Sequence, residues 1–459
     1  MNIIIKITPY FEVEKKYIIN WFFSTLKIKN VDIKVHNSNK YEILINNKKI
    51  FLPDSFFINA KNNWLKEESV PRKTFKINLP NSFIKKFNIN YLFSIHDTNE
   101  TKFELNQESI NIPIDLFGNA FFFITRYHEF VFKDKVDEHK RHLSKNSFIN
   151  HNFQEPIIDQ YLNFLKEILN IFLFKKISYV SSKFQISCDV DTPYDRSEKK
   201  FFLIKKKIFK KNFFLNLDKN LKSLTNYLFS KLKIYNYDIF NTYEWIMKQN
   251  EKKNHKVTFF FISKNKDKFD SFYSLEEDRI KKILKLIDYR GHNIGLHGSY
   301  MSYNDEKKLS EEKKILETSL EKLKIKTPIE ENRFHFLRWS NSSSINALEK
   351  SGFNFDSSIY YADQPGYRSG TSKNFNLFDL NKSKISNVIE KPLTMMDVSL
   401  FDKNYLNLKS TKDVNQYIDM FFKILKSNNC DFNLLWHNST LLSKEEKDFY
   451  KKILLKLDD

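Results

Sequence analysis

The sequence contains little of three residue types on which small or specialised folds depend. Its 459 residues include 2 cysteines, 7 glycines and 10 prolines, whereas 41% of the chain is hydrophobic. Cys188 and Cys430 cannot form a disulfide framework or a thiolate zinc site, which favours a reducing compartment. This composition excludes collagen-like and disordered chains, and the length predicts two or three folded domains.

Arginine is also scarce. The formal net charge is +20, but only nine of the 76 basic residues are arginine. Arginine is the side chain that binds phosphate and guanine through a planar fork, so a lysine-rich, arginine-poor chain has charge without that recognition chemistry. We therefore expect no nucleic-acid partner.

Long apolar runs are absent from the sequence. Phe121–Ile124 is typical of the longest runs, far below the roughly 20 residues that cross a bilayer. The start, Met1 to Pro9, has no basic n-region and no small-residue cleavage site, which predicts a first β-strand rather than a signal peptide. We expect a soluble, cytoplasmic protein.

Hydrophobic periodicity divides the chain into two parts. Residues 1–150 mix a helical pattern at 12–26 with alternating stretches at 31–36 and 41–52, the latter turning at Asn46-Asn47 like a hairpin. This predicts an N-terminal α+β domain of unknown function. A helix at about 156–174 lies in a connecting segment, 151–183.

From residue 184 onward, predicted strands alternate with helices. The strands are at 184–190, 256–263, 292–297, 333–337, 353–357, 387–391 and 432–437. Ser274–Glu277 and Ser443–Glu446 are expected capping boxes of two amphipathic helices. Repeated β/α units predict a parallel sheet, open or closed into a barrel, with its active site at the carboxyl ends of the strands.

Six of the seven glycines fall between residues 291 and 370. Gly352 is most simply explained as the residue that ends a helix. The others lie in two loops, 291–298 and 365–370, where the backbone must be closely approached. We interpret these loops as placing the chemistry in the C-terminal half.

Carboxylate and imidazole side chains follow several predicted strands. Asp189 and Asp191 end the first β/α strand, and alternation along a strand points them to the same side. An isolated Asp-x-Asp would be most simply a turn. Here other predicted strands also end in charged or imidazole side chains, which favours a shared site over an isolated turn. These residues are His297, Arg333, His335 and His437.

These segments resemble the successive motifs of the polysaccharide deacetylases, carbohydrate esterase family four. The motifs are Asp189–Asp191, Gly291–His297, Arg333–Phe336 and Leu434–Asn438. Segments 355–370, 392–398, 115–122 and 125–129 resemble a bacterial subgroup with an uncharacterised N-terminal domain. The resemblance implies a distorted (β/α) barrel over 184–459 that removes acetyl groups from sugar polymers with a bound divalent metal.

The resemblance also implies a role for each matching residue. Asp189 would be the general base, and Asp191 and His297 would be metal ligands. Arg333 would orient the base, and a backbone N–H near Phe336 would form part of an oxyanion hole. His437 would protonate the leaving amine, with its ring held by Asp397.

One position departs from the family pattern. The second metal histidine of the family falls at Met301, a poor ligand for a hard or borderline cation. An imidazole appears instead at His335, where the family has proline. We predict a divalent ion, zinc being the expected one, bound by Asp191, His297 and His335, with Ser299 as a weaker substitute. The alternative is that His335 is a packed strand residue and the metal is lost.

An insertion at about 194–254 contains a run of basic and apolar residues at 199–214. A lysine-rich solvated face is the favoured interpretation, and weak contact with an anionic membrane surface is the alternative.

The sequence thus predicts a metal-dependent hydrolase that removes an acetyl group from a sugar of a cell-surface polysaccharide or its precursor. A metal-free C–N hydrolase on the same barrel and a degenerate carbohydrate-binding barrel are the alternatives. The acetylated carbohydrate is the expected partner, and the oligomeric state is not predicted.

Overall fold

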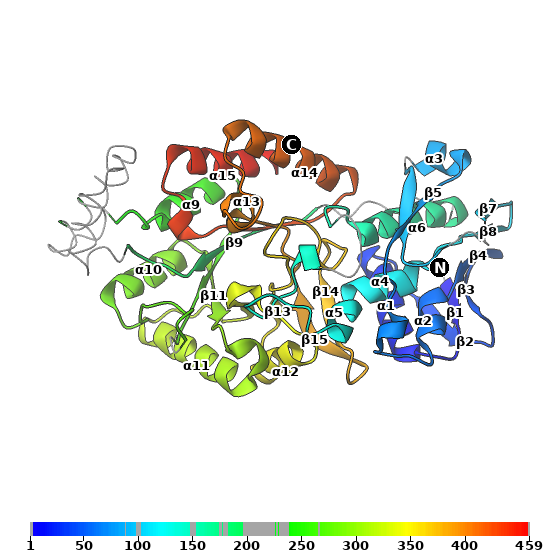
Figure 1. The fold of residues 1–459 in the computed structure, drawn as a ribbon, viewed down its shortest axis with the longest axis horizontal. Coiled ribbons are helices and arrows are strands. Elements are labelled where there is room, and N and C mark those ends of the chain that lie inside the picture. Colours follow the sequence, from blue (N-terminus) through cyan, green and yellow to red (C-terminus); the bar gives the residue numbers. More distant parts are fainter. Residues whose placement is uncertain are drawn as a thin grey trace.

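A computed structural model gives the fold of the chain (Figure 1). It describes residues 3–87, 89–97, 102–146, 153–173, 177, 182–195, 225, 228, 238–264 and 267–457. The basic run at 199–214 and most of the predicted insertion at 194–254 lie outside the described residues. None of the helices within these ranges combines the length and apolar character that a bilayer crossing needs.

The N-terminal region is built on a six-stranded mixed sheet and a two-stranded ribbon. The large sheet has the order β2-β1-β3-β4-β8-β7, and β5 pairs with β6. The strands are β1 (Ile3–Ile7), β2 (Val31–Val35), β3 (Lys40–Ile45), β4 (Lys48–Pro53), β5 (Phe75–Asn78), β6 (Tyr91–Ser94), β7 (Glu104–Leu105) and β8 (Ser109–Asn111). The helices are α1 (Glu12–Thr25), α2 (Ser55–Ala60), α3 (Asn81–Phe87), α4 (Leu116–Ile124), α5 (Tyr127–Val131) and α6 (Ile157–Leu173).

Local sequence signals explain several of these elements. The predicted hairpin is confirmed: β3 and β4 are antiparallel, and Asn46 and Asn47 both have positive φ, as a tight hairpin turn requires. Helix α1 buries an apolar face, but Val13 is 46% exposed. The first turn instead buries Lys15, which pairs with Asp54 at 2.6 Å.

The C-terminal region is a distorted (β/α) barrel, as predicted. Its nine strands have the order β14-β15-β13-β12-β11-β10-β9-β17-β16, and all neighbours are parallel except β14 and β15. They are β9 (Phe184–Val190), β10 (Val257–Phe261), β11 (Asn293–Gly298), β12 (Glu331–Phe334), β13 (Phe355–Asp356), β14 (Phe375–Asp379), β15 (Lys384–Glu390), β16 (Met395–Met396) and β17 (Phe432–Leu435).

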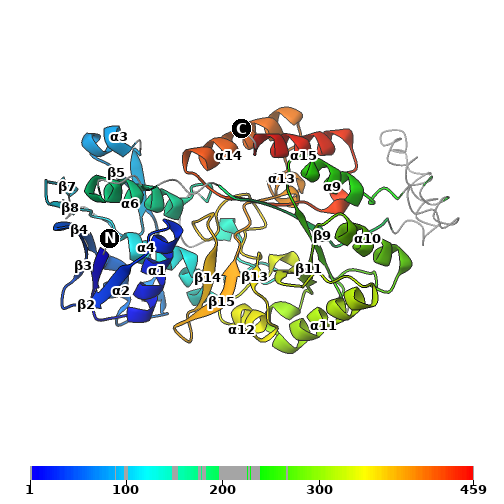
Figure 2. The same ribbon diagram turned by 180° about the vertical axis from the view of Figure 1, so that it is seen from behind.

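Helices surround this sheet (Figure 2). They are α9 (Tyr243–Glu251), α10 (Asp278–Tyr289), α11 (Glu306–Lys322), α12 (Ser343–Lys350), α13 (Asp397–Phe401), α14 (Thr411–Ser427) and α15 (Lys444–Lys456). The capping box of Ser443 and Glu446 is confirmed at the start of α15. The one predicted at Ser274 is wrong, because Ser274 and Glu277 form a turn and α10 begins only at Asp278.

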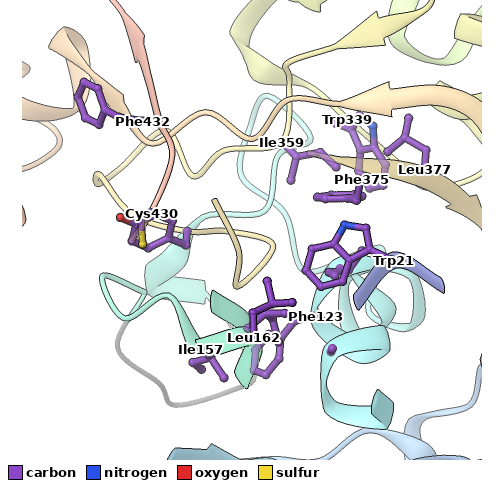
Figure 3. Close-up of a cluster of buried hydrophobic side chains, with 14 of the residues drawn as sticks. Trp21, Phe123, Ile157, Leu162, Trp339, Ile359, Phe375, Leu377, Cys430 and Phe432 are labelled. Atoms are coloured by element: carbon purple, nitrogen blue, oxygen red, sulfur yellow. The ribbon is translucent and has the colours of Figure 1, made fainter. Parts of the chain in front are cut away.

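The two regions share an apolar core. Figure 3 shows Trp21 of α1 beside Phe375 of β14, and Phe123 of α4 beside Leu162 of α6 in the same cluster. Polar contacts cross the same boundary: the Trp21 indole N–H donates to the Asn374 carbonyl at 3.0 Å. The barrel is therefore packed directly against helices of the N-terminal region.

A buried ion cluster joins two of the segments that carried the family resemblance. The Glu129 carboxylate accepts hydrogen bonds from Arg126 at 2.6 Å and from Arg368 at 2.7 Å. All three side chains are at most 5% exposed. The charges of the two guanidinium groups outweigh burial and hold the pKa of Glu129 well below its usual value.

The loop around Gly366 and Gly370 also docks on this boundary. A Cβ at Gly366 would lie 2.4 Å from the Phe153 carbonyl oxygen, and one at Gly370 would lie 3.2 Å from the Phe123 side chain. Both glycines have positive φ. The predicted close approach to this loop is confirmed, and residues of the N-terminal region make it: the two glycines allow close packing between the two regions.

Candidate active site

The carboxyl ends of four parallel strands form one side of a cavity of about 260 Å³. β9 contributes Asp189 and, just beyond its end, Asp191; β11 contributes His297. His335 follows β12, and His437 follows β17. Other lining residues are Arg141, Phe336, Leu337, Ala362, Met396, Val398, Asp402, Asn404, Tyr405 and Leu435. The fold thus brings the predicted strand-end residues together because parallel strands end on one side of the sheet.

Asp189 is buried and is held by Arg333. The Arg333 Nη1 donates to Asp189 Oδ1 at 2.8 Å, and the same nitrogen donates to the Ser187 hydroxyl at 2.8 Å. Ser357 accepts from the other guanidinium nitrogens through its carbonyl and its hydroxyl. Because the guanidinium is fully buried and fixed on both sides, it sets the orientation of the carboxylate.

Asp191, His297 and His335 form a candidate metal site. One ligand atom from each lies within 4.8 Å of the others. His297 Nε2 is 3.1 Å from Asp191 Oδ1, and His335 Nε2 is 3.7 Å from Asp191 Oδ2. Asp191 Oδ1 is buried and has no hydrogen-bond partner among the described residues. Two imidazoles and a carboxylate around one point are a donor set that fits zinc or a related divalent ion.

The second nitrogen of each imidazole is also satisfied. His297 Nδ1 is 2.7 Å from the Arg333 carbonyl, and His335 Nδ1 is 3.2 Å from Asp270 Oδ1. A hydrogen on each Nδ1 therefore donates outward and leaves the Nε2 lone pair directed toward Asp191. This arrangement is typical of metal-binding histidines, whose outer nitrogen is fixed by a carbonyl or carboxylate.

Met301 and Ser299 stay out of this group. The Met301 side chain is 39% exposed, with its sulfur 3.6 Å from the Arg338 Nη1. The Ser299 hydroxyl donates to Glu312, which also accepts the Ser299 backbone N–H. The structure therefore gives Ser299 another partner, and His335 occupies the place next to Asp191.

The charges of this group couple strongly. Burial alone would raise the pKa of Asp191, but His335 and His297 outweigh it and hold that pKa well below its usual value. Burial would lower the pKa of His335, but the carboxylates of Asp191 and Asp270 raise it to about 9. A proton and a metal cation thus compete for the same imidazole nitrogen.

His437 and Asp397 form a pair next to Asp191. His437 Nδ1 is 2.8 Å from Asp397 Oδ1, and His437 Nε2 is 3.5 Å from Asp191 Oδ2. Burial would lower the pKa of His437, but the charge of Asp397, supported by Asp191 and Asp189, raises it to about 10. The imidazole is therefore protonated at neutral pH and faces the cavity as a proton donor.

Several residues of this site, Asp270 and Arg141 among them, were not predicted from the sequence. Asp270 and Arg141 lie in loops without a motif and reach the site only through the fold. The sequence shows only that arginine is scarce; the structure shows that five of the nine arginines, Arg126, Arg141, Arg333, Arg338 and Arg368, are buried.

Comparison with protein families identifies both regions. Residues 238–353 match the model of the polysaccharide deacetylase family, and residues 3–174 match a family of unknown function (DUF7033). The first match includes His297, Arg333 and His335. The boundaries that we predict at residues 150 and 183 remain predictions.

The solved structures that match this chain do so with low sequence identity and low TM-scores. A putative polysaccharide deacetylase from Mycobacterium smegmatis is 13% identical (TM-score 0.37; 61% of this chain, 86% of that one). Puue allantoinase is 12% identical (TM-score 0.35; 60% and 84%), and a probable polysaccharide deacetylase from Pseudomonas aeruginosa PAO1 is 17% identical (TM-score 0.29; 46% and 65%). Among curated proteins, no match was found.

The family models, rather than these neighbours, therefore identify the regions. Residues 238–353 are similar to the polysaccharide deacetylase family, and residues 3–174, which precede them, are similar to the DUF7033 family.

Proposed function

We propose that the chain is a metal-dependent deacetylase that removes, by hydrolysis, an acetyl group from a sugar of a cell-surface polysaccharide or its precursor. The family match supports the deacetylase activity. The observation that carries the metal dependence is the meeting of Asp191, His297 and His335 in the cavity that also holds Asp189 and His437. Within the described residues, this is the group that offers three converging ligand atoms.

The bound ion would supply Lewis acidity, which polarises the acyl carbonyl and makes a nearby water more acidic. Asp191, His297 and His335 are the residues that would hold it. Zinc fits this donor set best, since two imidazoles and a carboxylate are a common catalytic zinc arrangement.

Asp189 is the proposed general base. Its carboxylate accepts a proton from the attacking water, while Arg333 keeps it oriented toward the cavity. The water oxygen forms a bond to the acyl carbon, and the C–N or C–O bond to the sugar then breaks.

His437 completes the reaction on the other side. Its protonated imidazole gives a proton to the leaving nitrogen or oxygen of the sugar, and Asp397 stabilises the cationic ring before transfer. A base and an acid on two sides of one substrate carbon separate the two proton transfers. Acetate and the deacetylated sugar are the products.

Acetate release by the full chain tests the proposal. The substrates are N-acetylglucosamine oligosaccharides and an O-acetylated glycan of the producing cell. Each is incubated with protein from which a chelator has removed the metal, and with the same protein after zinc has been added back. Release that is lost on chelation and restored by zinc supports the proposal. Equal release with and without metal favours a metal-free hydrolase, and oligosaccharide binding without release favours a carbohydrate-binding barrel. The sequence also predicts a cytoplasmic location, which cell fractionation checks.

A further inference from the structure

Residues 137–141 belong to the stretch matched by the DUF7033 family, yet one of them contributes a side chain to the lining of the candidate active-site cavity. They follow α5 in a loop, and Arg141 is one of the cavity's lining residues together with Asp189 and His335. The Arg141 side chain is 9% exposed. A side chain from the N-terminal region is therefore built into the site of the barrel.

Asp137 gives this loop its shape. Its Oδ1 accepts the backbone N–H groups of His139 at 3.0 Å and of Arg141 at 2.8 Å. Its Oδ2 accepts from the Arg141 guanidinium, at 3.0 Å from Nε and 2.8 Å from Nη2. The carboxylate thus fixes both the backbone and the charged head of Arg141.

Arg141 spans the cavity edge from this anchor. Its Nη1 donates to the Phe336 carbonyl at 3.2 Å, and its Nη2 donates to the Tyr405 hydroxyl at 3.1 Å. One guanidinium therefore connects the DUF7033 region with two separate loops of the barrel. Lysine has a single ammonium group and cannot reproduce this planar set of donors.

The segment held in this way is conformationally unusual. Phe336 and Leu337 have φ of 60° and 56°, and neither is glycine. Residues with side chains are strained in this backbone conformation, which persists only where the surroundings hold it. The His139 ring lies against the Phe336 ring with 4.5 Å between centroids, so the same loop contacts both the carbonyl and the side chain of Phe336.

We propose that Asp137, His139 and Arg141 are positioning residues that hold the Phe336–Leu337 turn in its catalytic conformation, so that the DUF7033 domain completes the active site. The resemblance assigns the backbone N–H near Phe336 to the oxyanion hole, and the catalytic part of this inference rests on the proposed deacetylase function. A donor displaced by even 1 Å from a developing oxyanion loses much of its effect. The N-terminal region then acts on the rate of the reaction.

Two Arg141 variants and a matched control test this. Arg141→Ala removes all donors, Arg141→Lys keeps the charge, and Arg72→Ala removes a 57% exposed arginine of the same domain. We expect Arg141→Ala to lower kcat by about tenfold to a hundredfold. KM and metal content should change little. Arg141→Lys should restore part of kcat, and Arg72→Ala should match the parent.

Amide hydrogen exchange provides a readout that does not depend on activity. In Arg141→Ala the amides of residues 336–338 should exchange about tenfold faster or more, while those of β12 keep their protection. Unchanged exchange at 336–338 would overturn the positioning role whatever the enzyme does. Faster exchange with a parental kcat would overturn the catalytic part. A parent protein that releases no acetate would instead contradict the proposed function, and the exchange result would still decide the positioning role.

Discussion

His437 Nδ1 lies 2.8 Å from Asp397 Oδ1, and the opposite nitrogen of the same ring faces Asp191 at 3.5 Å. The ring thus lies between a fixed buried carboxylate and the candidate metal site. The Asp397 side chain is fully buried, and its Oδ2 accepts the His437 backbone N–H at 3.0 Å. This contact fixes both the position and the charge of the proposed acid.

Replacing Asp397 by asparagine should therefore move the alkaline limb of the pH–rate profile to lower pH. The pKa of His437 is raised to about 10, with burial opposing and Asp397 the largest charge that raises it. Because the proposed acid must be protonated, activity falls as pH rises through this pKa, and removing an anion lowers it. Asp191 and Asp189 also raise the pKa of His437, so in Asp397→Asn that pKa should stay partly raised. A pH profile of kcat checks this, and an unmoved limb would contradict the pairing.

His437→Ala tests the same residue by removal. Loss of a general acid should lower kcat by about a hundredfold or more, while metal content stays near that of the parent. His255→Ala is a suitable control, because His255 is not among the cavity-lining residues. If kcat falls less than about tenfold, His437 does not act as the acid.

His335→Ala should weaken metal binding about tenfold or more. Even the loss of a residue that only hydrogen-bonds to a metal ligand costs about 10–100-fold in metal affinity. Titration of the metal-free protein with zinc measures the effect. Met301→Ala is the matched control and should bind zinc as the parent does, because the Met301 side chain points to Arg338. Equal affinity in His335→Ala would contradict the predicted ligand set.

Metal binding should also depend on pH. The pKa of His335 in the metal-free protein is about 9, with burial opposing and Asp191 and Asp270 raising it. Zinc must displace this proton, so affinity should rise as pH increases toward 9 and level off above it. Isothermal titration in two buffers of different ionisation enthalpy counts the released protons. No proton release near pH 7 would argue against His335 as a ligand.

The site itself was largely predictable from the sequence, because parallel strands of a barrel end on one side. Once Asp189, Asp191, His297 and His437 are each assigned to a strand end, the topology places them near one another without further information. The identity of His335 as the residue beside Asp191 needed a second signal, the imidazole at a position where the family has proline.

Loop contacts were not predictable in the same way. Asp270 supports His335 from a loop that no periodicity describes, and Arg141 reaches the cavity across nearly two hundred residues of sequence, to Phe336. The close backbone approach at Gly366 and Gly370 was predictable, but the sequence does not show whether a substrate or a neighbouring domain makes it. Only the fold shows Phe153 and Phe123 there.

The Glu129 cluster makes a prediction about stability. Glu129→Gln leaves Arg126 and Arg368 without their buried anion and should lower the free energy of unfolding by about 3–5 kcal/mol. The pKa of Glu129 is lowered in the fold, so its contribution is present above its unfolded value of about 4.5 and is lost as pH falls below it. Urea unfolding at pH 7 and at pH 4 measures both effects.

Glu12→Gln is the control for this measurement. Glu12 pairs with Lys16 on the surface of α1, and both side chains are more than 40% exposed. An exposed pair of this kind contributes about 1 kcal/mol or less. A Glu129→Gln variant as stable as Glu12→Gln would show that the cluster does not hold the two regions together.

The measurement that tests the central claim most directly is acetate release by Asp189→Asn, with zinc content determined on the same preparation. Asp189 is assigned to proton transfer and Asp191 to metal binding, although the two residues are neighbours at the end of β9. We predict that Asp189→Asn keeps about one zinc ion and loses hydrolysis, whereas Asp191→Asn loses both. Full activity of Asp189→Asn on an acetylated glycan that the parent hydrolyses would contradict the account.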